Sequence, residues 1–143
     1  MPRFAHTLSV SAPPSRIYGI VDDVSRTPEW LTRCTGIDQL DPGPVDVGTR
    51  LRYHYRDGRR TGTMDGQVVA HEPDRHFAMK FTDSMMDVTV DFVAASDGVG
   101  TSLTHTIDIV TKGVGVLFSP LIKRQLPKQT MDAMTRLKAL AEG

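Results

Sequence analysis

The sequence has little of what several classes of protein require. Cys34 is its single cysteine, so no disulfide can form within the chain, and we expect a cytoplasmic location. Its 17 basic and 17 acidic side chains cancel, which argues against binding to nucleic acid or to a membrane through a polybasic surface. No apolar run approaches the roughly 20 residues that span a bilayer. Residues 1–143 are therefore expected to form a single domain without a membrane span.

Motifs that hold metals or phosphates are also lacking. The five histidines show neither His-x-x-x-His nor His-Glu-x-x-His spacing, and Cys34 has no second cysteine as a companion. The segment KGVGVLF, residues 112–118, lacks the third glycine of a dinucleotide fingerprint and is interpreted as a flexible connection. We accordingly expect no metal and no cofactor.

Alternation of apolar and polar residues is the main pattern that the sequence does have. In residues 3–12, Phe4, His6 and Leu8 fall on one face, as in a half-buried strand. The same period of two recurs from residue 36 to residue 111, between turn signals such as the Asp57–Gly58 pair of a tight hairpin. The pattern predicts about six or seven antiparallel strands, each with one apolar face.

Helical spacing occurs at two places. Two short helices are predicted after the first strand, one led by the prolines of residues 13–14 and one from Thr27. A long helix is predicted over residues 121–141, with Leu137 on its buried face and with a kink or restart at Pro127. Because only this helix is long enough to cover the apolar strand faces, we predict an α+β fold in which a curved antiparallel sheet grips a long C-terminal helix.

Five segments, in this order, resemble the START-like, helix-grip superfamily and within it the polyketide cyclase/dehydratase-like proteins. They are VSAPPSRIYGIVDDVSRTPEW (10–30), VGTRLRY (47–53), GQVVAHEPDRHFAM (66–79), GVGTSLTHTIDI (98–109) and RLKALAEG (136–143). The resemblance implies a cavity between the sheet and the long helix, in which some members bind a hydrophobic ligand and others catalyse a reaction. No catalytic motif of one subfamily is present to be carried over.

Two histidines interrupt otherwise apolar strand faces. In the helix-grip arrangement the first and last strands are antiparallel neighbours, and a register that pairs Phe4 with Ile107 places His6 opposite His105. The two imidazoles would form a general acid/base pair or a polar anchor for a ligand oxygen. The alternative is two neutral core histidines, each hydrogen-bonded to a neighbour.

The remaining candidates for the cavity are aromatic residues and methionines. Trp30 is either a lid at one end of the cavity or ordinary core filling, and Tyr53 and Tyr55 either bind ligand or pack in the core. Methionine adapts to varied apolar shapes, so a methionine-rich wall suits a ligand cavity, although a plain core is the alternative. The predicted lining residues are Trp30, Tyr53, Tyr55, Phe77, Met79, Met86, Val88, Val90, His105 and Met134.

Three functions remain open on this evidence. The first is binding of a hydrophobic or polyaromatic small molecule, such as a polyketide, a lipid or a quinone-like compound, by a monomer or homodimer. The second is a cofactor-independent cyclase or dehydratase that uses His6, His105, Tyr53 or Tyr55 in acid/base chemistry. The third is a protein-interaction module without a ligand.

Overall fold

The structure is a computed structural model, and it describes residues 3–57 and 59–143. Its elements are β1 (Arg3–Val10), α1 (Pro14–Val21), η1 (Val24–Arg26), α2 (Thr27–Trp30), β2 (Cys34–Gln39), β3 (Arg50–Asp57), β4 (Arg60–Glu72), β5 (His76–Thr82), β6 (Met86–Ser96), β7 (Thr101–Thr111), η2 (Gly113–Phe118) and α3 (Ser119–Glu142). The prefix η denotes a 3-10 helix. Gly58, part of the predicted hairpin turn, lies outside the described residues, and β3 and β4 pair up to Asp57 and Arg60.

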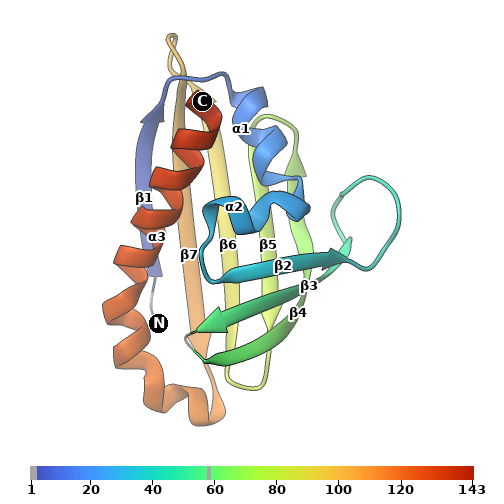
Figure 1. The fold of residues 1–143 in the computed structure, drawn as a ribbon, viewed down its shortest axis with the longest axis vertical. Coiled ribbons are helices and arrows are strands. Elements are labelled where there is room, and N and C mark those ends of the chain that lie inside the picture. The colour runs from blue at the N-terminus through green and yellow to red at the C-terminus, as the bar shows by residue number, and fades with distance from the viewer. Residues whose placement is uncertain (1–2, 58) are drawn as a thin grey trace.

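The seven strands form one antiparallel sheet in the order β1-β7-β6-β5-β4-β3-β2. All three α-helices cover the same face of this sheet, which is called the inner face below (Figure 1). The predicted α+β helix-grip fold is confirmed. The predicted pairing of the first and last strands is also confirmed, because Phe4 lies opposite Ile107 and His6 opposite His105.

Helix α3 is the longest element and packs along β1 and β7. Its buried face repeats at intervals of three to four residues, and Leu137 is only 1% exposed. The helix continues through Pro127 as one element, so of the predicted kink or restart the restart does not occur. Proline removes one backbone hydrogen bond, and the buried side chains of Leu126 and Thr130 on either side fix this part of the helix to the core.

The glycine-containing segment before α3 also differs from its prediction. Residues 113–118 form the 3-10 helix η2, whereas the sequence suggested a flexible connection. The backbone nitrogen of Lys112 donates to the carbonyl oxygen of Met85 at 2.9 Å, which ties the start of η2 to the β5–β6 turn. Among the described residues, no helix combines the length and the apolar character needed to cross a membrane.

Candidate functional site

The predicted lining residues come together on one side of the sheet. Apart from His105, they belong to the apolar core between the sheet and the helices or pack against it. His105 joins them through a stacked contact with Phe92, whose ring centroid is 4.2 Å from that of the imidazole. The structure thus unites residues from α2, α3 and four strands in one region.

The part of the inner face near the β6–β7 turn, called the upper part, is closed. At its lower limit the ring of Trp30 packs edge-on against the ring of Phe92, with the ring centroids 5.4 Å apart, and the Phe92 ring stacks on the imidazole of His105. Trp30 and His105 are each 1% exposed. Trp30 is therefore deeply buried, and whether it also borders a ligand stays a prediction.

Several buried polar atoms in this region have no hydrogen-bond partner. They include both ring nitrogens of His105, Nε1 of Trp30 and Oγ1 of Thr27. Burial, together with the neighbouring His6, lowers the pKa of His105 to about 3, so the imidazole is neutral at pH 7. A buried polar group without a partner costs about 1–3 kcal/mol. A neutral imidazole in this position offers one donor and one acceptor to a polar group of a ligand.

The two histidines are neighbours without being bonded to each other. His6 lies directly across from His105 in the strand pair, but neither ring nitrogen of His105 has a hydrogen-bond partner. The two rings therefore share no hydrogen bond, and the alternative of two core histidines that are each hydrogen-bonded to a neighbour is wrong for His105. His6 is half-buried on the edge strand and its ring lies parallel to that of Phe4.

The part of the inner face nearer η2, called the lower part, is incompletely covered. The pair Val90–Ile107 directly follows the pair Phe92–His105 along β6 and β7, and both of its side chains are half-buried. The predicted residues Met86, Val88, Tyr53 and Tyr55 are also half-buried. The first half of α3, residues 119–130, buries only Leu126 and Thr130. A half-exposed apolar surface therefore leads to the unpartnered nitrogens of His105.

Two tyrosines border this lower part. The rings of Tyr53 and Tyr55 are stacked with centroids 6.2 Å apart, and Tyr53 also packs on Phe81 at 5.3 Å. Burial raises the pKa of Tyr53, while the positive charge of Arg33 partly opposes this shift. The phenol of Tyr53 is consequently neutral at pH 7, able to donate a hydrogen bond or accept one.

Arg33 was not singled out by the sequence reasoning. It follows α2, and its Nη2 atom donates to Oε1 of Gln125 on α3 at 3.2 Å. Turning the side-chain amide of Gln129 by 180° places its oxygen 2.7 and 3.1 Å from the two terminal nitrogens of Arg33, from which it then accepts. This bridge joins the α2–β2 connection to α3 beside Tyr53. The spacing of Gln125 and Gln129, four residues apart on a helix, is a signal from which a shared partner could have been inferred, although not which residue it is.

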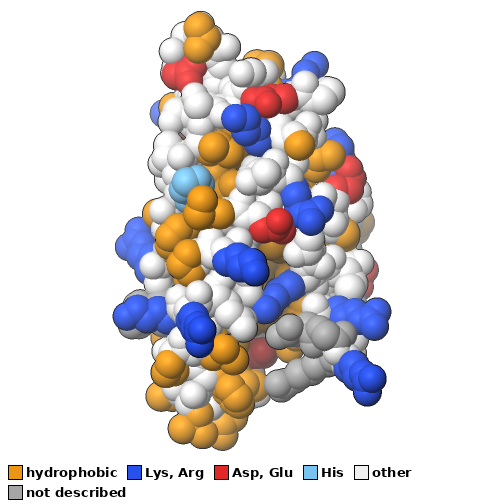
Figure 2. Space-filling model, turned by 60° about the vertical axis from the view of Figure 1, so that its left-hand side comes forward, with side chains coloured by type: hydrophobic (Ala, Val, Ile, Leu, Met, Phe, Trp, Pro, Cys, Tyr) orange, Lys and Arg blue, Asp and Glu red, His pale blue; other side chains and the backbone are white. Residues whose placement is uncertain are grey.

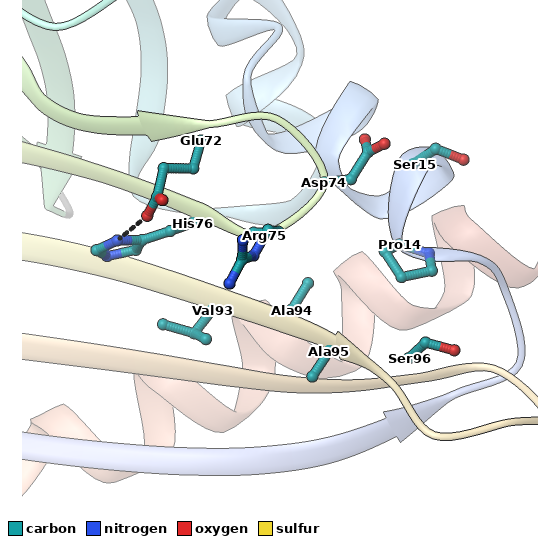
Figure 3. A pocket seen from close by; sticks show the side chains of 10 residues that line it. All are labelled: Pro14, Ser15, Glu72, Asp74, Arg75, His76, Val93, Ala94, Ala95 and Ser96. Atoms are coloured by element: carbon teal, nitrogen blue, oxygen red, sulfur yellow. Dashed lines mark ion pairs between the residues drawn. The ribbon is translucent and has the colours of Figure 1, made fainter.

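Two pockets open on the surface, and none of the predicted residues lines them. One, of about 600 Å³, lies between the β4–β5 turn and the upper end of β6 (Figure 3). There Nδ1 of His76 is 3.6 Å from Glu72, and its Nε2 is 2.7 Å from Asp91. The other contains His71 and Asp22, 3.9 Å apart. Within residues 3–57 and 59–143, no cluster of His, Cys, Asp and Glu is suited to hold a metal ion.

Comparison with known families agrees with this architecture. A family model described as "Polyketide cyclase / dehydrase and lipid transport" matches residues 1–142. The chain belongs to this family. No curated protein matches the sequence.

Solved structures confirm the fold of this family member. The ZhuI aromatase/cyclase from Streptomyces sp. R1128 superposes with a TM-score of 0.80 at 15% identity, over 98% of this chain and 93% of that one. TTHA0849 from Thermus thermophilus superposes with a TM-score of 0.79 at 14% identity, over 98% of this chain and 97% of that one. The di-domain aromatase/cyclase BexL from the BE-7585A biosynthetic pathway superposes with a TM-score of 0.77 at 22% identity, over 99% of this chain and 50% of that one. Identities this low establish the fold alone.

Proposed function

We propose that this protein binds a hydrophobic or polyaromatic small molecule, of polyketide, lipid or quinone type, on the lower part of the inner face. The observation that carries the proposal is the half-exposed apolar surface next to a buried histidine whose two nitrogens lack partners. Ligand sites are concave and largely apolar, with a few polar groups that fix orientation. The lower part has this composition, and the family includes lipid transport in its description.

The proposal includes an orientation for such a ligand. Its apolar body packs on Met86, Val88 and Val90, and a carbonyl or hydroxyl group reaches His105. The neutral imidazole donates to a carbonyl or accepts from a hydroxyl, which removes the cost of its unpartnered nitrogens. At the outer end, Tyr53 and Arg33 hydrogen-bond a second oxygen.

A second candidate is a cofactor-independent polyketide cyclase or dehydratase. Two of the proteins with similar structures are named as aromatase/cyclases, which supports this candidate. The low pKa of His105 makes it a weak general base, because catalysis at neutral pH favours a pKa near 7. As an enzyme, the protein would instead use His105 and Tyr53 as neutral hydrogen-bond donors that polarise a substrate carbonyl. Product analysis with a poly-β-keto substrate tests this, and loss of product in Tyr53→Phe with binding retained would support it.

Ligand binding is tested with the purified protein in two steps. Native mass spectrometry looks for a small molecule that co-purifies, and titration with the fluorescent probe 1-anilinonaphthalene-8-sulfonate measures occupancy of an apolar site. We expect micromolar-range binding, with about tenfold weaker affinity for Val90→Trp, which fills the lower part. The matched control is Val93→Trp, because Val93 lies on the same strand with its side chain 43% exposed. Absence of both a co-purified molecule and probe binding, or equal loss in the two variants, would contradict the proposal.

A further inference from the structure

An apolar tip protrudes where η2 meets α3. Val114, Val116, Leu117, Phe118 and Leu121 form this tip. They are five of the twelve large apolar side chains that are exposed among the described residues, so nearly half of these side chains fall within eight positions. Leu117 is 80% exposed. The tip lies at one end of the long axis of the molecule and is visible as an apolar surface at the bottom of Figure 2.

The backbone holds these side chains outward. Gly115 is the one buried residue of η2, and a Cβ atom at this position would collide with the carbonyl oxygen of Met85. The helix therefore contacts the β5–β6 turn through a residue without a side chain, and its valines, leucine and phenylalanine face solvent. Apolar side chains of this size normally gain free energy by burial, so a fixed exposed cluster needs a partner.

Along the chain segment that carries the tip the charges have one sign, although the adjoining β5–β6 turn contains Asp83 and leads to Asp87. Residues 109–131 contain Lys112, Lys123, Arg124 and Lys128 but no acidic residue. Lys112 pairs with Asp87 at 3.0 Å. The other three are exposed, and no carboxylate of the described residues lies within ion-pair distance of them. The zero net charge of the whole chain conceals this local excess of positive charge.

We propose that the tip inserts shallowly into the surface of an anionic lipid bilayer, with Lys123, Arg124 and Lys128 at the headgroups. A convex apolar cluster with a basic collar is the composition of an interfacial membrane element. Each Lys or Arg close to an anionic surface adds about 1 kcal/mol, which corresponds to about fivefold in affinity. A second copy of this chain is a poorer occupant, because a symmetric contact would bring two basic collars together.

Docking stands independently of ligand binding, yet the two sites are adjacent. Met86, at the start of β6, pairs with Thr111 just before η2, and it borders the lower part of the inner face. A docked molecule therefore holds the uncovered end of the inner face close to the lipid. This placement suits uptake of an apolar molecule from the bilayer.

The test is sedimentation of the full chain with lipid vesicles. We expect binding to phosphatidylcholine vesicles that contain about one third phosphatidylglycerol, and at least about tenfold weaker binding to phosphatidylcholine alone. The double variant Leu117→Ser with Phe118→Ser should lose about tenfold or more. The matched control is Val99→Ser at the opposite end of the molecule, because Val99 is even more exposed, at 93%. Thermal unfolding of each variant verifies that the fold is intact.

A second pair of variants isolates the charge contribution. Lys123→Gln with Arg124→Gln should weaken binding to anionic vesicles by about tenfold or more, whereas Lys80→Gln, on an exposed strand position, should leave it unchanged. Failure to bind anionic vesicles overturns the proposal, as does equal binding to both lipid mixtures. Dimerisation that the Leu117→Ser with Phe118→Ser variant abolishes would assign the tip to a second copy instead. Probe binding at the inner face is measured separately, so its outcome does not affect this test.

Discussion

The side chain of His105 makes one favourable and one unfavourable contribution to the stability of the fold. Its ring gains dispersion energy from the stacked contact with Phe92, but its two nitrogens are buried without hydrogen bonds, which is unfavourable. Phenylalanine has a similar shape and no polar atoms, so it would serve a purely structural role better. The imidazole at this position therefore supports the proposal that a polar group of a ligand binds on the inner face.

The pH dependence of stability reports on this residue. The pKa of His105 is about 3 in the folded protein, well below the ordinary value near 6.5, so between these values the unfolded chain binds the additional proton. Stability is therefore complete above pH 6.5 and is lost as the pH falls toward 3. The loss attributable to His105 between pH 7 and pH 5 is about 2 kcal/mol.

Urea unfolding of the wild type and of His105→Phe, at pH 7 and at pH 5, measures this contribution. We expect the variant to be as stable as the wild type or more stable at pH 7, and to lose about 2 kcal/mol less on acidification. If both proteins lose the same free energy of unfolding, the assignment to His105 is refuted. Probe titration of the same variant at pH 7 is expected to show weaker binding of ligands that carry a carbonyl.

At the scale of single elements, α3 does two different tasks along its length. Its second half closes the upper part of the inner face, whereas its first half contributes little to the core, adds Leu121 to the tip and carries the basic collar. Leu137 and Leu121 are the same residue type on the same helix, one 1% and the other 50% exposed. Replacing each of them by alanine compares how much the two halves of α3 contribute to the free energy of unfolding.

Replacing Leu137 by Ala should lower the free energy of unfolding by about 2–5 kcal/mol, because a buried side chain is lost and a cavity remains. Leu121→Ala should change it by less than about 0.5 kcal/mol, since the side chain is largely in solvent. Denaturant titration followed by circular dichroism gives both values. A similar loss in the two variants would mean that the first half of α3 is packed as tightly as the second.

The contrast between η2 and the strands shows where sequence reasoning succeeds. Period-two alternation predicted the strands and their inner faces because each residue has only two choices of face, and a shift by one residue would expose the whole apolar set. No such constraint acts on residues 113–118. Their conformation depends on Gly115 fitting against the carbonyl of Met85, a contact between distant segments that no local pattern records.

For the whole molecule, the single cysteine is a probe of cooperative opening. Cys34 is buried on β2, an edge strand of the sheet, and burial raises its pKa to about 11. Its thiol should therefore react with a disulfide reagent at pH 8 about 100-fold more slowly in the native protein than in the unfolded chain. Stopped-flow labelling across a denaturant series measures the rate. Rapid labelling without denaturant would instead show that β2 detaches from the sheet on its own.

The features of the candidate site that the sequence did not predict depend on how distant segments of the whole chain pack together. Alternation placed His105, Tyr53 and Val90 on the inner face, and the family resemblance placed His6 across from His105. The sequence did not reveal that the lower part is only half-covered, because this depends on α3 lying along β1 and β7. Nor did it reveal the bridge from Arg33 to Gln125, whose partners are 92 positions apart.

The pairing of β1 with β7 also constrains how the chain emerges from the ribosome. Thr7 and Thr104, which share a hydrogen bond across these strands, are 97 positions apart. Strand β1 therefore has no partner until β7 has been translated, and α3, which packs on both strands, follows β7. Contacts between distant positions slow folding, and unpaired apolar strands are prone to aggregate. We therefore expect the emerging chain to be most prone to aggregation before β7 and α3 have been translated.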